Sequence, residues 1–295
     1  MALLIKSSSP RRVKVKWPQL DITISVEMNE GQNSHVVDLF FESLPYRSLQ
    51  NHALVSGDHL YHLVPCEKLI YTHADYKHLE IKYGPLTEYL PAAPCGRVLP
   101  EDMDSLRAAG NGVWKACHQT KQIIGVIIWD ARQVEPTEHL PLRQERFGVT
   151  DEVKALVRKI HDETEKSWSG ISDDLRIAHN GMAPSCAGSK GSYFATMVFI
   201  NGEIRPLGYN VVFASVPSEF VGYTGASFLC MTNREIADLI KQSVQTNPDH
   251  VVACEDFLAL ISAFGKYVNL LNAQNLCLFP WRHSTECPIA LNKTD

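Results

Sequence analysis

Apolar residues near the start of the chain follow two different periods. Val13–Trp17 and Ile22–Met28 alternate or cluster as β-strands do. The apolar residues within Ser34–Ser43 recur instead at the spacing of a helix. The pattern therefore predicts the order strand, strand, helix for the first part of the chain.

A histidine-rich run, Asn51–Val64, follows and is predicted to form a hairpin. Gly57-Asp58 is a typical two-residue turn, and pairing about it assigns each side chain to one of two faces. One face would carry His52, Ser56, His59 and Tyr61, and the other Ala53, Val55, Leu60, His62 and Val64. We expect the first face to line a pocket and the second to join the core.

Three more strands are expected in the first half of the chain, at His78–Tyr83, Gly112–His118 and Gln122–Trp129. On the second of these, Trp114 and His118 would share a face because side chains alternate along a strand. Many strands with one early helix are typical of a small β-barrel.

The segment Ala131–Thr150 contains two prolines and little periodic apolar sequence, so it is expected to link two domains. Beyond it, Thr150 is a candidate N-cap for a helix, and Thr232 with Glu235 forms a capping box that would open a second. The apolar stripe of Glu255–Asn272 predicts a third helix. The second domain is therefore expected to be mainly helical.

A second hairpin is predicted between these helices. Tyr193–Ile200 and Tyr209–Val216 have the pattern of strands, and they are joined through Asn201-Gly202, a strong signal for a tight turn. The sequence leaves open whether this hairpin completes the barrel or belongs to the helical part.

The composition is that of an ordinary globular protein and argues against several partners. The chain has 295 residues, of which 45% are hydrophobic and 21% charged, with a formal net charge of −5. An acidic balance disfavours nucleic acids and anionic membranes as partners. No apolar run approaches the roughly 20 residues of a membrane span, and Ala2–Ile5 is too short for a signal-peptide core, so a cytoplasmic protein is expected.

One basic cluster stands out near the start of the chain, formed by Lys6, Arg11, Arg12, Lys14 and Lys16. We interpret it as a solvated leader and first strand. The eight cysteines show no C-x-x-C spacing and are expected to be buried thiols rather than metal ligands.

Several common catalytic motifs are missing from the sequence. It contains no G-x-G-x-x-G or G-x-x-x-x-G-K-[ST] loop for a nucleotide, and no G-x-S-x-G elbow for a serine hydrolase. The usual nicotinamide-dependent and serine-hydrolase interpretations therefore have no motif to support them.

Four segments, Trp17–Ile22, Leu44–Ala53, Lys82–Pro85 and Gly202–Gly208, resemble the mikimopine and cucumopine synthases, which are opine-forming enzymes. The resemblance implies an α+β fold. It would consist of a cyclophilin-like β-barrel at residues 12–135 and a mainly helical domain, with an inserted hairpin, at residues 150–280.

The resemblance also implies an activity. These enzymes join L-histidine to 2-oxoglutarate by imine formation and ring closure, a Pictet–Spengler reaction that uses no redox cofactor, which would account for the missing nucleotide motif. Such a site must bind carboxylates, take protons from the amine and the attacking ring, and protonate a departing hydroxyl. Acid–base groups and cations are both required.

Candidate residues follow from these requirements. Histidine titrates near neutral pH and suits proton transfer. The candidate acids and bases are His52, His59, His118 and Glu88, with Glu80 as a weaker alternative that could simply neighbour Lys82. The candidate carboxylate and ring contacts are Lys82, Tyr83, Arg97, Trp114, Lys115, Arg205 and Tyr209. His62, on the opposite predicted face from His52 and His59, is expected to be structural.

Two other functions remain open at the level of sequence. A cyclophilin-like barrel could act as a peptide-binding module or prolyl isomerase, because a fold alone does not fix function. The histidines could alternatively ligate a metal in a hydrolase, although His59 with His62 and His73 with His78 are odd distances apart and would face opposite ways on strands. We expect no metal and no cofactor, and the sequence leaves open whether the chain forms homo-oligomers.

Overall fold

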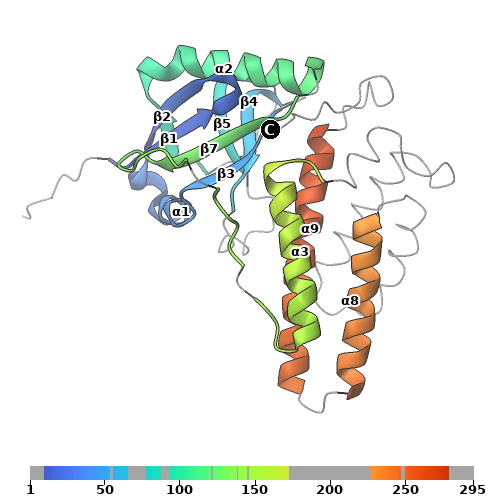
Figure 1. The fold of residues 1–295 in the computed structure, drawn as a ribbon. Coiled ribbons are helices and arrows are strands. Elements are labelled where there is room, and N and C mark those ends of the chain that lie inside the picture. Colours follow the sequence, from blue (N-terminus) through green and yellow to red (C-terminus); the bar gives the residue numbers. More distant parts are fainter. Residues whose placement is uncertain are drawn as a thin grey trace, which may run out of the picture. The chain divides into compact units, whose positions relative to one another are not determined.

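The structure is a computed structural model that describes residues 10–53, 56–65, 78–87, 93–120, 122–137, 139–144, 146–172, 227–246 and 250–278 (Figure 1). The chain divides into two compact units, Met1–Pro141 and Leu142–Asp295. Glu88, Arg205, Tyr209 and the predicted hairpin at 193–216 lie outside the described residues.

The first unit is built on one antiparallel sheet with the strand order β5-β4-β3-β7-β1-β2-β6. The strands are β1 (Arg12–Trp17), β2 (Ile22–Met28), β3 (Tyr46–His52), β4 (Gly57–Leu63), β5 (His78–Leu86), β6 (Gly96–Val98) and β7 (Ile124–Asp130). Helix α1 (Glu30–Glu42) follows β2, and α2 (Met103–Lys115) follows β6. The predicted α+β class is confirmed, and where the sequence predicted a cyclophilin-like barrel the structure has a curled antiparallel sheet, a half-barrel, followed by helices (Figure 1).

Helix α2 covers one face of this sheet, which we call the inner face. Val13, Val15 and Trp17 of β1 point to it, and all three are almost completely buried. Leu106, Ala109 and Val113 of α2 belong to the same core cluster. Alternation along the strands thus separates this core from the opposite, outer face.

The segment predicted as a strand at Gly112–His118 is helical, so that prediction was wrong. It forms the end of α2 and a π-helical turn, η4 (Ala116–Thr120). Trp114 and His118 do share a face, but because they are four residues apart on a helix rather than on a strand. The helical period was present in the buried positions Leu106, Ala109 and Val113.

Gly110 explains why this helix is easily missed. A Cβ atom at this position would overlap the Tyr83 ring, so the close approach of α2 to β5 requires glycine. Glycine lowers helix propensity by about 1 kcal/mol relative to alanine. The packing demand therefore obscures the helix signal in the sequence.

The register of β3 and β4 also differs from the prediction. Asn51 pairs with Tyr61 and His52 with Leu60, so the connection is longer than the predicted turn at Gly57-Asp58. The pairing is shifted by an odd number of residues, which turns each side chain of one strand to the other face. His52 therefore shares the inner face with Leu60 and His62, and His59 lies on the outer face.

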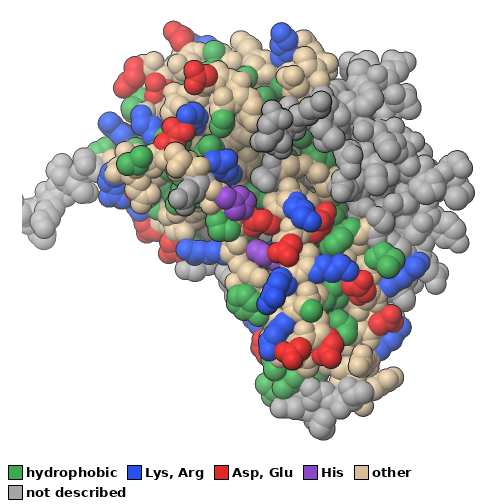
Figure 2. All heavy atoms as spheres, viewed as in Figure 1, with side chains coloured by type: hydrophobic (Ala, Val, Ile, Leu, Met, Phe, Trp, Pro, Cys, Tyr) green, Lys and Arg blue, Asp and Glu red, His purple; other side chains and the backbone are tan. Residues whose placement is uncertain are grey.

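The second unit packs three described helices, α3 (Asp151–Ser169), α8 (Ser227–Thr246) and α9 (His250–Leu278), around one apolar core (Figure 1). The predicted helical character of this region is confirmed. Acidic and basic side chains are interspersed over its surface (Figure 2), as in the pair of Lys159 and Glu235 at 2.9 Å. No helix in the described part of the chain is long and apolar enough to span a membrane.

Thr232 does not open a helix. Helix α8 begins at Ser227, so Thr232 and Glu235 lie inside it, and the predicted capping box was wrong. Thr232 is buried instead in the helical unit.

The N-terminus of α3 is capped by a residue from a different helix. Asp256 of α9 is almost completely buried, and its carboxylate accepts hydrogen bonds from Val149 N (2.5 Å) and from Thr150 N (3.2 Å). The Thr150 hydroxyl donates to the same carboxylate at 2.7 Å. Thr150 thus precedes the helix as predicted, but its side chain makes no capping bond to α3 itself.

Replacing Asp256 with asparagine should destabilise the helical unit. The amide group keeps one acceptor but loses the negative charge and turns a donor toward the N–H groups of residues 149 and 150. We expect a loss of about 1–3 kcal/mol in the free energy of unfolding, measured by urea denaturation. Glu255→Gln is the matched control, because Glu255 pairs with Arg146 at the surface and should change stability by less than about 1 kcal/mol. Equal effects of the two variants would contradict the capping role.

A buried histidine should make the first unit sensitive to acid. His62 is fully buried, Tyr46 Oη and His62 Nε2 are 2.9 Å apart, and burial, aided by the charge of His78, lowers the pKa of His62 to about 3. The unfolded chain takes up a proton near its ordinary pKa of about 6.5, whereas folded His62 does not. Stability that is present above pH 6.5 is therefore lost as the pH falls toward 3.

We expect this histidine to contribute a loss of about 1.4 kcal/mol per pH unit between pH 6 and pH 4. The measurement is the free energy of unfolding by urea at several pH values, compared with His62→Gln. A slope that is the same in the variant would show that other groups cause the acid sensitivity.

Candidate active site

The sheet register distributes the predicted acid–base residues over two clusters. His52, Tyr83, Trp114 and His118 gather between the inner face and the end of α2, and we call them the inner cluster. His59, Tyr61, His78, Glu80 and Lys82 lie on the outer face of β4 and β5, and we call them the outer cluster. The predicted pairing of His52 with His59 on one face was wrong.

His52 is the centre of the inner cluster and has both ring nitrogens engaged. Nδ1 lies 2.7 Å from the carbonyl oxygen of Ala53, and Nε2 lies 2.5 Å from the Tyr83 hydroxyl. Since a carbonyl oxygen only accepts, Nδ1 carries the proton, and in the neutral ring Nε2 accepts from Tyr83. Burial lowers the pKa of His52 and raises that of Tyr83, so both groups are held in their neutral forms.

Aromatic rings close the inner cluster. Trp114 meets His52 edge to face at 4.9 Å between ring centroids, and His118 lies 4.1 Å from Trp114. His52 keeps only 5% of its surface exposed, whereas Trp114 keeps 37%. The arrangement is a packed aromatic group with a partly exposed indole at its edge.

Residues of the outer cluster lie directly opposite one another on the neighbouring strands β4 and β5. Tyr61 pairs with Glu80, and His59 pairs with Lys82. The ring of Tyr61 lies between those of His59 and His78, with centroid distances of 6.3 and 5.2 Å. This face therefore brings a carboxylate, an ammonium group, two imidazoles and a phenol together.

His59 is the buried member of the outer cluster. It keeps 3% of its surface exposed, and its Nδ1 is buried without a hydrogen-bond partner among the described residues. Burial lowers the pKa of His59, Glu80 opposes this shift and Lys82 adds to it. Glu80 and Lys82 are exposed and form no ion pair within the described part of the chain. Both ring nitrogens of His52 are engaged, whereas Nδ1 of His59 is not engaged within the described part of the chain.

Two other predicted carboxylate-binding residues lie away from both clusters. Arg97 is on β6 at the opposite edge of the sheet from β5, in register with Glu27. Lys115 is exposed at the last position of α2. The structure therefore does not bring Arg97 and Lys82 into one group.

From the sequence alone, Glu80 ranks below the histidines, because a charged residue that alternates with Leu79 and Ile81 is also typical of a solvated strand face. The signal that could have raised it is its strand partner, Tyr61, which follows only from the register of β4 and β5. No three His, Cys, Asp or Glu side chains of the described segments are placed to hold a metal ion.

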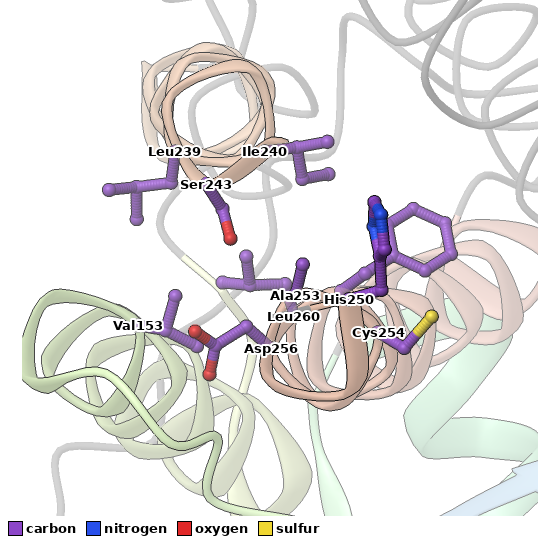
Figure 3. A pocket seen from close by; sticks show the side chains of 10 residues that line it. Val153, Leu239, Ile240, Ser243, His250, Ala253, Cys254, Asp256 and Leu260 are labelled. Carbon is purple, nitrogen blue, oxygen red and sulfur yellow. The ribbon is translucent and has the colours of Figure 1, made fainter. Parts of the chain in front are cut away.

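A cavity of about 330 Å³ lies in the helical unit (Figure 3). Its walls are mainly apolar, with Leu239 and Ile240 from α8 and Phe257 and Leu260 from α9. Asp256 also lines it, but its carboxylate already accepts the hydrogen bonds that cap α3. His250 and Cys254 also line the cavity, but no lysine or arginine is among its lining residues, so it lacks the cation that the outer cluster provides.

Comparisons with known proteins agree with the fold and with the resemblance. The model of the cucumopine synthase C-terminal helical bundle domain matches residues 153–216 and 211–278. No curated protein gives a significant match. The solved structure of McbB in complex with tryptophan is similar, with 37% sequence identity and a TM-score of 0.74, over 92% of this chain and 98% of McbB. Together these matches show that the chain belongs to the cucumopine synthase family and is related to McbB.

Proposed function

We propose that the protein is a cofactor-independent Pictet–Spengler enzyme that condenses L-histidine with 2-oxoglutarate to an opine of the mikimopine or cucumopine type. The observation that carries the proposal is the similarity to McbB along nearly the whole chain, because that relative was solved with tryptophan bound. Tryptophan, like histidine, is an amino acid whose heteroaromatic ring can act as a carbon nucleophile. The helical-bundle match to cucumopine synthase supports an opine as the product.

We infer that the outer cluster is the acid–base centre. The reaction needs a base, a proton donor and a cation for the carboxylates in one place that substrates can reach. Glu80 and Lys82 are exposed, and His59, which lies beside them, has a buried Nδ1 without a hydrogen-bond partner among the described residues, so it is the group that an approaching substrate would have to uncover. The inner cluster supports this role less well, because both nitrogens of His52 are already bonded.

The roles follow from the chemistry of each group. His59, neutral because burial lowers its pKa, takes a proton from the substrate ammonium. The free amine attacks the ketone carbon, and His59 returns the proton to the departing hydroxyl, so that water leaves and a protonated imine, an iminium ion, forms. The ring carbon of the substrate imidazole then attacks the imine carbon, and Glu80 takes the proton that this ring loses. Lys82 holds a substrate carboxylate as a point charge.

In this proposal the inner cluster has a structural role and holds β3, β5 and α2 together on the face of the sheet opposite the acid–base centre. His52 ties the end of β3 to Tyr83 on β5, and Tyr83 packs against Gly110 of α2. Since neighbouring residues on one strand point to opposite faces, a fixed Tyr83 also fixes Lys82 on the outer face.

The substrate assignment predicts a product that mass spectrometry can detect. Purified protein incubated with L-histidine and 2-oxoglutarate, without any nucleotide, should form an adduct with the summed mass minus one water. L-Tryptophan is the competing amine, because McbB was solved with it. If a product forms with tryptophan but not with histidine, the substrate assignment is wrong and tryptophan is the amine. If neither amine gives more product than boiled protein does, the proposed activity is overturned.

The roles of Glu80 and His59 predict losses of turnover without loss of folding. Glu80→Gln and His59→Gln should each lower kcat by about 10²–10⁴-fold, which is the usual size of a general acid or base contribution. Glu101→Gln and His35→Gln are matched controls at exposed positions of the same unit and should keep full activity. If instead His52→Gln and Tyr83→Phe lowered kcat in folded protein while Glu80→Gln did not, the centre would lie in the inner cluster.

A further inference from the structure

Three of the basic residues near the start of the chain line a second cavity, of about 400 Å³. Arg11, Arg12 and Lys14 meet Arg132, which follows β7, so residues far apart in sequence contribute to it. The lining is completed by Pro10, Ser25, Leu99 and Ala131. No acidic residue is among these lining residues, and four of the eight are cations.

Carboxylates fix the three arginines without using all of their donors. Arg11 donates through Nε to Glu30 and through one Nη to Asp38, at 2.9 and 2.7 Å. Arg12 and Arg132 likewise donate through Nε and one Nη, to Glu27 and Asp130. The second Nη group of each guanidinium has no acceptor in the described segments. Each of these lining arginines therefore keeps donor groups that the described carboxylates do not use.

Lys14 is the cation that no carboxylate balances among the described residues. Its ammonium group is partly buried and donates to the Ser25 hydroxyl at 2.9 Å. Asp102 is the acidic residue bound next to this pair, but it accepts from the backbone N–H of Ser25 at 2.7 Å rather than from Lys14. A partly buried ammonium group without a counter-ion is stabilised by an anion that binds beside it.

We propose that this cavity binds a small oxyanion with two negative charges, either a phosphate group or a dicarboxylate. Guanidinium groups match the planar pairs of oxygens on both anions, and the lysine supplies a point charge. The cavity is lined from β1, β2 and the end of β7, whereas the proposed acid–base centre lies on β4 and β5. The proposal therefore stands whether or not the reaction assigned to that centre is correct.

Calorimetric titration of the full chain tests the proposal. Inorganic phosphate and glutarate are the two probes, and sodium chloride keeps the ionic strength constant. We expect saturable binding of at least one probe, and the tighter binding that the variants of this cavity weaken identifies which kind of oxyanion the cavity prefers. Glutarate has no ketone, so it cannot enter the proposed condensation.

Variants connect the binding to this cavity. Lys14→Gln and Arg12→Gln should each lower the affinity for the preferred probe by about tenfold or more, since a hydrogen bond between charged groups contributes at least that much. Lys154→Gln removes the same charge from an exposed position of α3 and should leave the affinity unchanged. Absence of saturable binding, or equal affinity in all variants, would overturn the proposal.

Discussion

The pairing register of β3 with β4 decides what chemistry the first unit can perform. His52 opposite Leu60 places one histidine under α2 and turns His59 to the other side. Because strand side chains alternate with a period of two, a slip by one residue would exchange the two sets completely. Burial of Leu60 and Ile81 against α2 holds the register, since a slipped strand would present polar side chains to this core. The apolar packing of one face thus fixes the composition of the other.

The two clusters illustrate how burial changes the use of the same residue type. His52 and His62 are held neutral and bonded to tyrosines, so they contribute to packing. Nδ1 is without a hydrogen-bond partner among the described residues in both His59 and His62, but only His59 lies next to an exposed acid and an exposed lysine. An imidazole count in the sequence does not distinguish these situations. What distinguishes them is the residue across the strand.

Much of the fold could be predicted from alternation and spacing, and the failures have identifiable causes. Strands β1, β2, β5 and β7 follow the apolar pattern closely. Helix α2 was missed because Gly110 and Gly112 lower its propensity, and Gly110 is required by the ring of Tyr83. The cap of α3 comes from Asp256, about a hundred residues away along the chain, so no local motif indicates it. The predicted site residues fall on two faces of the sheet, because the connection after His52 is longer than the predicted two-residue turn and this changes the register of β3 and β4.

The place of β7 in the sheet has a consequence for how the first unit assembles. β7 is the last strand of its unit in sequence, yet it lies in the middle, between β3 and β1. Until residue 130 has been synthesised, the β1–β2 hairpin and the β3–β4–β5 meander have no strand to join them, and each presents an unpaired edge. Unpaired edges favour association with other chains. A growing chain of this protein is therefore most exposed to aggregation just before β7 emerges, and a chaperone that shields those edges would act at that point.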